Sequence, residues 1–313
     1  MTPPAAPAPL PRVSVIVPTT CETARGDLIT RSIGSVFAQA GVTAELILVV
    51  NGSLVDECLL DQWRREPRLT VHRIDEGNVS RARVAGLRQA TGEFFSFLDD
   101  DDEFLPGALE LRARLLRGQP ELDVVVTNGF HHVDHDVTHV SAAFESTIHA
   151  DLGGSFLRQN WFASPASMFR RATCEIALFD TGLQHFEWTY LFFRLLSAGK
   201  RFHFDGRLTY RKYENNPASI SRTAQYELAW PSILRRVLDL PLESRLKVLI
   251  RDIRLTALNH SSVLLLKGGH VAEAAGLHWQ CLKAGGWRFL PYTGRLVAAA
   301  LRGPPASQRD MRR

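Results

Sequence analysis

The chain has 313 residues, of which 45% are hydrophobic and 22% are charged, so it is long enough for one large domain or a domain with an appendage. These proportions are those of an ordinary globular protein, and no apolar run approaches the length that spans a bilayer. Four scattered cysteines without a CxxC pair argue against a disulfide scaffold or a zinc site, and they fit a reducing compartment. We therefore expect a cytoplasmic protein.

The net charge of +4 is unevenly distributed along the chain. From Cys281 to the end the only acid is Asp310, against seven basic residues: Lys283, Arg288, Arg295, Arg302, Arg309, Arg312 and Arg313. Such asymmetry is found in proteins that contact an anionic membrane surface or nucleic acid, but a solvated basic tail is its commoner cause. Nucleic-acid binding is not expected, because the basic residues carry no recognisable motif and no interleaved aromatic residues.

The first third of the chain alternates between strand and helix patterns. We predict strands at 13–17, 45–50 and 69–74, helices at 28–39 and 54–65, and a helix from an N-cap at Ser80 to Ala90. Repeated strand–helix units of this kind predict a parallel, doubly wound sheet.

The most informative feature is a strand that runs directly into four aspartates, Asp99 to Asp102. Residues 94–98 form an apolar run without helical period, which predicts a central strand covered on both faces. Ligands of open α/β sheets bind at the carboxyl ends of the strands. Carboxylate oxygens suit Mg²⁺ or Mn²⁺, whose coordination is usually completed by water and substrate phosphates. We expect a divalent cation held for a diphosphate-bearing substrate, with a solvated acidic turn or acids at a helix start as alternatives.

Beyond the aspartates, Pro106 is expected to open a helix, and residues 123–127 and 201–204 read as strands. Residues 131–136 contain three histidines and two aspartates, but their period of two favours a hairpin over a metal site. A strong amphipathic helix is predicted at 187–198.

Helical periodicity runs from residue 242 to about 302, with a break at the glycines 268 and 269. We therefore divide the chain into a flexible Pro/Ala-rich tail (1–11), a sheet domain (12–225), a helical C-terminal region (226–303) and a basic flexible tail (304–313). The first segment has neither a basic nor an apolar region and does not read as a signal peptide.

Short motifs follow one another in order between about residues 13 and 222. They are SVIVPTT at 14–20, SIGSVFAQ at 32–39, ELILVVNGS at 45–53, RARVAG at 81–86, TGE at 91–93, the aspartate run closed by Pro106, FRR at 169–171, FD at 179–180, and Glu187 seven residues before Arg194 with Ala198 and Gly199 after it. Each is weak alone, but the ordered series resembles the inverting family 2 glycosyltransferases with the GT-A fold.

The resemblance implies an α/β fold of GT-A type, a doubly wound, mostly parallel sheet with a Rossmann-like nucleotide-binding half, followed by a helical C-terminal appendage. It implies non-processive, inverting, metal-dependent transfer of a sugar from a nucleotide-diphosphate sugar, with UDP expected, in polysaccharide, glycolipid or glycoconjugate biosynthesis. The donor-binding residues that it implies are Pro18, Thr19, Thr20, Asn51, Arg83, Asp99 and Asp100, with Asp101 on the Mn²⁺ or Mg²⁺ ion. Turn chemistry is an equal alternative for Thr20 and Asn51, and Asp102 is left as a helix-start acid.

The resemblance also points to a base that takes the proton of an acceptor hydroxyl, and here we expect Glu187. Many relatives carry Glu-Asp at this point and use the aspartate, whereas this chain has Trp188 there. The base is therefore Glu187, a neighbour such as His185, or a residue not identified, and Glu187 is alternatively an acid that complements a helix dipole. His185 and Trp188 are candidates for the acceptor side, the indole by stacking on a sugar face.

The sequence differs from the family pattern at two further places, both in polar segments expected near the donor. Thr20 stands where a tyrosine often follows the first-strand proline, and no Gln-x-x-Arg-Trp is present, which argues against a processive synthase. In its place, residues 210–222 predict a basic loop from which Arg222 or Arg211 binds the diphosphate, with a plain surface loop as the alternative.

Several partners and two other functions stay open. The C-terminal helices resemble accessory regions that serve oligomerisation or acceptor capture, so a homo-oligomer is one expectation and the acceptor is a saccharide, a lipid-linked molecule or a small molecule. Arg295 and Arg302, on a helix that Pro291 starts, fit peripheral contact at the inner face of a membrane or a helix packed on the main domain. The rival functions are a nucleotide-sugar-binding GT-A module with weak catalysis and a nucleotidyltransferase.

Overall fold

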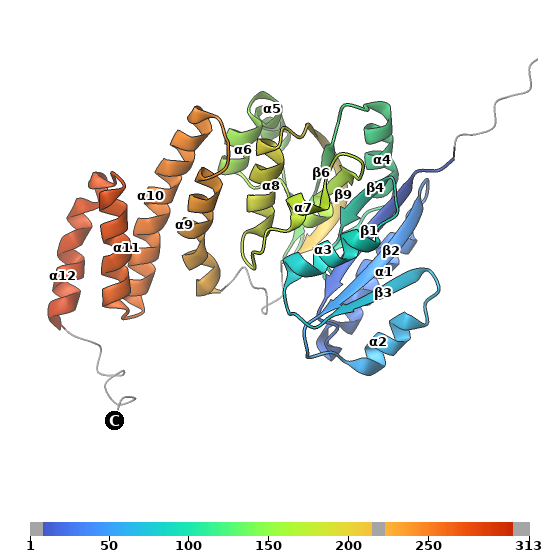
Figure 1. Ribbon diagram of the computed structural model, residues 1–313, viewed down its shortest axis with the longest axis horizontal. Helices are drawn as coiled ribbons and strands as arrows, with labels where there is room; N and C mark the ends of the chain where they lie inside the picture. Colours follow the sequence, from blue (N-terminus) through green and yellow to red (C-terminus); the bar gives the residue numbers. More distant parts are fainter. Residues whose placement is uncertain (1–8, 215–222, 303–313) are drawn as a thin grey trace, which may run out of the picture. The chain divides into compact units, whose positions relative to one another are not determined.

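The computed structural model describes residues 9–214 and 223–302 (Figure 1). The chain forms two compact units, residues 1–217 and residues 218–313. The first unit combines a sheet with helices, and the second is built from helices. The boundary that the sequence suggests at residue 226 stays a prediction. No helix in the described ranges is long and apolar enough to cross a membrane.

The strands of the first unit belong to one sheet. They are β1 (Arg12–Thr19), β2 (Thr43–Asn51), β3 (Leu69–Ile74), β4 (Phe94–Phe97), β5 (Glu103–Phe104), β6 (Val124–His132), β7 (Asp136–Thr138), β8 (Ser167–Arg170) and β9 (Phe202–Tyr213). Their order is β3-β2-β1-β4-β8-β6-β9-β5, and β7 pairs with β6. The neighbours from β3 to β4 are parallel, whereas β8 is antiparallel to both β4 and β6. The predicted doubly wound, mostly parallel sheet is confirmed.

Helices follow most strands of the first unit and make up the second. In the first unit they are α1 (Gly26–Phe37), α2 (Glu57–Arg64), α3 (Val79–Gln89), α4 (Ala108–Gly118), α5 (Ala142–Ala150), α6 (Leu152–Arg158), α7 (Ile176–Phe179) and α8 (Glu187–Ser197), with the 3₁₀ turns η1 (Thr23–Arg25) and η2 (Ser164–Ala166). In the second they are α9 (Ala224–Leu238), α10 (Ser244–Lys267), α11 (Val271–Lys283) and α12 (Thr293–Arg302), with the 3₁₀ turn η4 (Trp287–Tyr292).

The core of the sheet lies at β1, β2 and β4. Every residue of β1 after Arg12 is buried, and so is all of β4, as expected for strands with both faces covered. Helix α3 packs closely on β1 and β2 at Gly86, where an added Cβ would lie 2.4 Å from a methyl carbon of Ile16 and 3.0 Å from one of Val49. This close approach holds the start of α3 beside the carboxyl ends of the strands.

Two predicted helix starts are wrong, and so is the expectation for Asp102. Asn78 caps α3, because its side-chain oxygen accepts the N–H of Arg81 at 3.0 Å, while the Ser80 hydroxyl contacts that of Thr181. Helix α4 begins two residues after Pro106, behind Gly107 at φ 78°. Asp102 is buried at the edge of β5, six residues before α4, so it is not a helix-start acid.

The segment predicted as a basic loop begins inside a strand. Residues 210–213 are the end of β9, which pairs with β6 and β5, so a loop can start only after Tyr213. The hairpin expected at 131–136 is confirmed by the pairing of β6 with β7.

The helical C-terminal pattern is confirmed in the second unit, where each helix packs on the next (Figure 1). Helix α9 contains Pro231 and was not singled out by periodicity. Pro291 lies in η4 and does not start α12, which begins at Thr293.

The packing at Gly86 predicts a loss of stability in Gly86→Ala. The added methyl group overpacks a buried contact, so we expect the free energy of unfolding to fall by about 2 kcal/mol in urea denaturation. Gly34→Ala is the matched control, because Gly34 lies within α1 with nothing within 4 Å of an added Cβ. The control should gain roughly 0.5 kcal/mol from helix propensity, and equal losses in both variants would contradict the packing described here.

Candidate active site

Three predicted donor-site residues meet at the carboxyl ends of β1, β2 and β4. The Thr19 hydroxyl donates to Asp100 Oδ2 at 2.5 Å, and the Asn51 amide donates to the Thr19 carbonyl at 2.9 Å. All three side chains are buried. These bonds join the ends of three strands that are far apart in sequence, as expected for the ligand-binding edge of an α/β sheet.

The turn after β1 is strained. Pro18 is buried in β1 opposite Val49, and Thr20 is half-buried after the strand. Cys21 has φ 52°, a left-handed conformation that costs a residue other than glycine about 1–3 kcal/mol, and its N–H donates to the Thr19 hydroxyl at 3.0 Å. Burial, helped by the charge of Asp56, raises the pKa of the Cys21 thiol to about 11, so it is not a nucleophile at neutral pH.

Arg25, which sequence reasoning missed, lies on the aspartate run. From the turn η1 its Nε donates to Asp100 Oδ2 at 2.6 Å, and its Nη2 contacts Asp100 Oδ1 and lies 3.3 Å from Asp101 Oδ2. These bonds to the carboxylates raise the pKa of Arg25. Burial raises the pKa of Asp100, although Arg25 and Thr19 oppose that effect. The sequence held no signal for this contact, because it joins residues 75 positions apart.

The four aspartates have different environments. The Asp99 and Asp101 side chains are 30% and 26% exposed. Asp102 is 1% exposed, its Oδ1 accepts the N–H of Tyr213 at 3.0 Å, and its Oδ2 has no partner among the described residues. Burial, together with the nearby charges of Asp99 and Asp101, raises the pKa of Asp102 well above its ordinary value.

The chemistry of this donor set fits a hard divalent cation. Asp99 and Asp101 offer partly exposed carboxylate oxygens, the ligands that Mg²⁺ and Mn²⁺ prefer. Within the described ranges no three His, Cys, Asp or Glu side chains are arranged to hold a metal ion by themselves. A cation on Asp101 would therefore take its remaining ligands from water and substrate, and the metal site stays a prediction.

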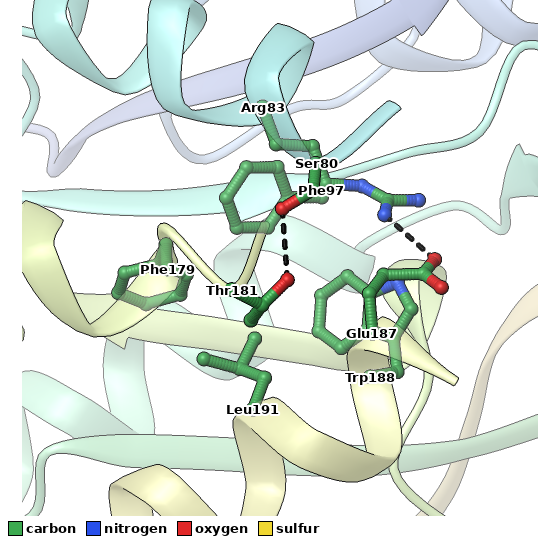
Figure 2. Close-up of a pocket in the computed structure, with 8 residues that line it drawn as sticks. All are labelled: Ser80, Arg83, Phe97, Phe179, Thr181, Glu187, Trp188 and Leu191. Atoms are coloured by element: carbon green, nitrogen blue, oxygen red, sulfur yellow. Dashed lines mark hydrogen bonds and ion pairs between the residues drawn. The ribbon is translucent and has the colours of Figure 1, made fainter. Parts of the chain in front are cut away.

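Arg83 connects the aspartate run to the predicted base. From α3 its Nη2 donates to Asp99 Oδ1 at 2.7 Å and its Nη1 donates to Glu187 Oε1 at 2.9 Å (Figure 2). The side chain is 8% exposed. Burial acts to lower the pKa of Arg83, but the two carboxylates outweigh it and raise that pKa. The Arg83 guanidinium therefore connects Asp99, one of the predicted donor-binding residues, with Glu187.

Glu187 is the first residue of α8, and its side chain is 19% exposed. Phe186 before it has φ 53°, the second non-glycine residue with left-handed backbone in the described ranges, and this turn directs Glu187 toward Arg83. The helix N-terminus also favours the negative charge of Glu187, so the alternative role of a dipole-complementing acid stays open.

Trp188 packs into aromatic side chains beside a small cavity. Its ring meets Phe97 and Phe162 edge to face, with centroids 5.7 and 5.2 Å away, and the Arg83 guanidinium lies 5.2 Å from its centroid. The indole N–H is buried and has no hydrogen-bond partner in the part of the chain that the structure describes. His185 is half-buried nearby in the chain. The acceptor roles of Trp188 and His185 stay predictions.

The cavity beside Trp188 has room for about one water molecule. Figure 2 shows its lining, with the Ser80 and Thr181 hydroxyls 2.9 Å apart on one side and the Arg83–Glu187 pair on the other. The lining residues are Ser80, Arg83, Phe97, Phe179, Thr181, Glu187, Trp188 and Leu191.

The sequence predicted that Arg222 or Arg211 binds the diphosphate from a basic loop, and the structure tests only one of these two arginines. Arg222 lies outside the described residues, so its donor role stays a prediction. Arg211 is part of β9 and is engaged with Asp136 and Glu103, which corrects its assignment as a loop cation. Arg211 and His132 lower the pKa of Asp136 to about 2.

Known proteins that are similar to this chain indicate its family. The model for Glycosyl transferase family 2 matches residues 14–172. An uncharacterized glycosyltransferase of Rickettsia bellii is 33% identical over 107 residues, which are 34% of this chain and only 15% of that protein. The uncharacterized glycosyltransferase RP339 of Rickettsia prowazekii is 21% identical over 282 residues, 83% of this chain and 82% of that protein.

Solved structures show the same fold. TarS 1–349 of S. aureus in complex with UDP-GlcNAc superimposes with a TM-score of 0.56 at 20% identity, over 79% of this chain and 72% of that chain. The same fragment in complex with UDP gives 0.54 at 19% identity, over 83% and 75% of the two chains. This likeness confirms the predicted fold class.

The bridge formed by Arg83 predicts a selective loss of stability. Arg83→Met leaves Asp99 and Glu187 without their shared cation, so we expect the free energy of unfolding to fall by about 2 kcal/mol in urea denaturation. Arg81→Met is the control on the same helix, because Arg81 is 59% exposed and, within residues 9–214 and 223–302, pairs only with Glu76. It should change stability by less than about 0.5 kcal/mol, and similar losses in the two variants would refute the role given to the bridge.

Proposed function

Because the chain belongs to glycosyl transferase family 2, we propose that it transfers a sugar, with inversion, from a nucleotide-diphosphate sugar to an acceptor hydroxyl. The observation that carries the proposal is the Arg83 bridge, which brings Asp99 at the donor strand ends and Glu187 at the start of α8 to one guanidinium. Donor-binding groups and a carboxylate base at one place are what this reaction requires.

The donor half of the site supports a uridine nucleotide. The TarS structures hold UDP-GlcNAc and UDP, and this chain shares their fold. We propose that Thr19, Thr20 and Asn51 bind the base and that Asp100 binds the ribose. The inward-facing hydroxyl, amide and carboxylate at these strand ends are groups that recognise a nucleoside by hydrogen bonds.

Glu187 is proposed to act as general base. Its Oε1 accepts from Arg83, which fixes the carboxylate, and Oε2 takes the proton of the acceptor hydroxyl. As that proton leaves, the acceptor oxygen forms a bond to the anomeric carbon from the side opposite the diphosphate. The bond from that carbon to the diphosphate oxygen breaks, and its electron pair leaves with the nucleoside diphosphate. The configuration at the anomeric carbon is therefore inverted.

A divalent cation is the expected cofactor, and Asp101 would hold it with support from Asp99. When bound, Mn²⁺ or Mg²⁺ would act as a Lewis acid that stabilises the charge on the departing diphosphate. The exposed edges of both carboxylates support this assignment. The acceptor is proposed to be a saccharide, a lipid-linked molecule or a small molecule in polysaccharide or glycoconjugate biosynthesis.

The proposal predicts a separation of donor binding from transfer. Glu187→Gln should bind UDP as wild type does, because the Arg83 contact is kept, but should lose transfer by at least about a hundredfold, as loss of a general base does. His185→Gln tests the alternative base and should reduce transfer far less than Glu187→Gln does. Transfer is measured as release of UDP from UDP-sugars with Mn²⁺ in the presence of acceptors, and donor binding by thermal shift.

The other outcomes identify the alternatives. If Glu187→Gln transfers at the wild-type rate and His185→Gln does not, the base is His185. If the wild-type protein binds UDP-sugars but neither hydrolyses nor transfers them, the binding-module function is correct, and Trp188 in place of the usual aspartate explains it.

The second unit has the chemistry of a membrane-binding surface. Residues 218–313 contain fifteen basic and six acidic residues, a net charge of +9, whereas residues 1–217 have a net charge of −5. Trp279 and Trp287 are 57% and 62% exposed, and the Lys283 ammonium lies 5.2 Å from the Trp279 ring. Exposed tryptophans beside lysine and arginine suit the interface of an anionic bilayer. We therefore propose peripheral membrane contact through this unit.

This contact predicts salt-sensitive binding to anionic vesicles. In co-sedimentation with vesicles that contain phosphatidylglycerol, the double variant Trp279→Ser, Trp287→Ser should bind at least about fivefold more weakly, since each indole loses apolar burial in the interface. Leu54→Ser is the control, because Leu54 is 76% exposed on the first unit. Wild-type protein that stays in the supernatant, or a double variant that sediments like wild type, would contradict the proposal.

A further inference from the structure

Arg25 is the one guanidinium that the described structure places against both Asp100 and Asp101. It is the last residue of η1, between the strained turn at Cys21 and helix α1. Its Nε and Nη2 face the two oxygens of Asp100, and Nη2 also lies 3.3 Å from Asp101 Oδ2. The Arg25 side chain is 22% exposed, so its outer edge reaches solvent.

The contact neutralises a carboxylate that cannot stay charged alone. The Asp100 side chain is 6% exposed, and an isolated buried carboxylate would be strongly destabilised. Arg25 meets it with a bidentate pair, the strongest geometry for these groups, and the Thr19 hydroxyl adds a third bond. Without any ligand, both Asp100 oxygens already have partners.

The same guanidinium lies where a divalent cation would add positive charge. Asp101 is the proposed ligand of that cation, and one of its oxygens is shared with Arg25 Nη2. The positive charges of the guanidinium and of a cation held by Asp101 would repel each other at this short range. The guanidinium and the cation therefore compete for Asp101.

We infer that Arg25 is an internal counter-ion of Asp100 and Asp101 that competes with a divalent cation for Asp101. The inference rests on the proposed donor site. Its consequence is an order of binding: the donor-free protein binds the ion weakly, and the nucleotide diphosphate relieves the competition. The diphosphate offers Arg25 a new anionic partner, and it offers the cation additional oxygen ligands. The partly exposed side chain can turn to that partner while η1 keeps its fold.

The test is Mn²⁺ binding to donor-free protein, followed by the electron paramagnetic resonance signal of free Mn²⁺ during titration with MnCl₂. We expect Arg25→Gln to bind Mn²⁺ at least tenfold more tightly than wild type, because the competing charge is removed. Arg25→Lys keeps a charge and should stay within about threefold of wild type. Arg207→Gln is the control for the loss of one positive charge, since Arg207 is 53% exposed and its ion pair in the described structure is with Asp205. This variant should not change Mn²⁺ affinity.

Two further measurements make the result decisive. Asp101→Asn in the Arg25→Gln background should remove the gain, and a gain that survives this change would overturn the inference. Thermal melting checks that each variant is folded; if Arg25→Gln is unfolded, Arg25→Met replaces it with the same expectation. Arg25→Gln that binds Mn²⁺ no more tightly than the Arg207→Gln control would also overturn it.

UDP separates this inference from the proposed function. Wild-type protein with UDP should bind Mn²⁺ at least tenfold more tightly than without UDP. If wild type with UDP gains no affinity and Asp101→Asn has no effect, the proposed metal-dependent donor site fails. If UDP raises the affinity through Asp101 while Arg25→Gln leaves donor-free binding unchanged, only the role of Arg25 fails.

Discussion

The shared guanidinium of Arg83 is the interaction on which the site depends. Asp99 follows β4 and Glu187 starts α8, and the two carboxylates would repel each other without a cation between them. A buried arginine can hold both because its planar fork offers donors in fixed directions. The close packing of α3 on β1 and β2 at Gly86 places that arginine beside the strand ends. The sheet, α3 and α8 are therefore joined at a single charged group.

A cluster of aromatic side chains packs beside the charged groups of the site. Phe95, Phe97, Phe169 and Phe179 lie with ring centroids 5.0 to 6.0 Å apart, mostly edge to face, and Trp188 joins them from α8. Packed rings resist displacement, because interiors of this kind are close-packed and each ring has preferred contact geometry. Trp188, where relatives often carry aspartate, thus contributes packing to the site.

Arginines also set the charge balance of the acidic run. Arg25 faces Asp100 and Asp101, Arg83 faces Asp99, and Arg31 donates to the Asp101 carbonyl at 2.6 Å. The four consecutive aspartates are a strongly negative cluster in the sequence. In the fold, neighbouring arginines balance most of this charge. Asp102 has no arginine partner among the described residues, and burial raises its pKa well above its ordinary value.

Local patterns in the sequence predicted a large part of the fold. The apolar run before Asp99 became β4, the period at 187–198 became α8, and the apolar runs at 13–17 and 45–50 became β1 and β2, because burial on both faces of a strand requires such residues. The alternating run at 69–74 became β3 at the end of the sheet. The errors arose where two local signals compete. Ser80 was predicted as the N-cap in place of Asn78, and β9 was predicted too short because its residues 211–213 are polar and only half-buried.

The amino-acid sequence by itself determined the strand–helix alternation of the first third of the chain, the acidic end of β4 and the carboxylate at the start of α8, since periodicity and turn chemistry are local properties. The tertiary structure alone decided which charges meet. The pairs of Arg83 with Glu187 and of Arg25 with Asp100 join residues 104 and 75 positions apart, and no local pattern encodes such contacts. They exist because a doubly wound sheet brings the ends of its strands and the starts of its helices to one edge.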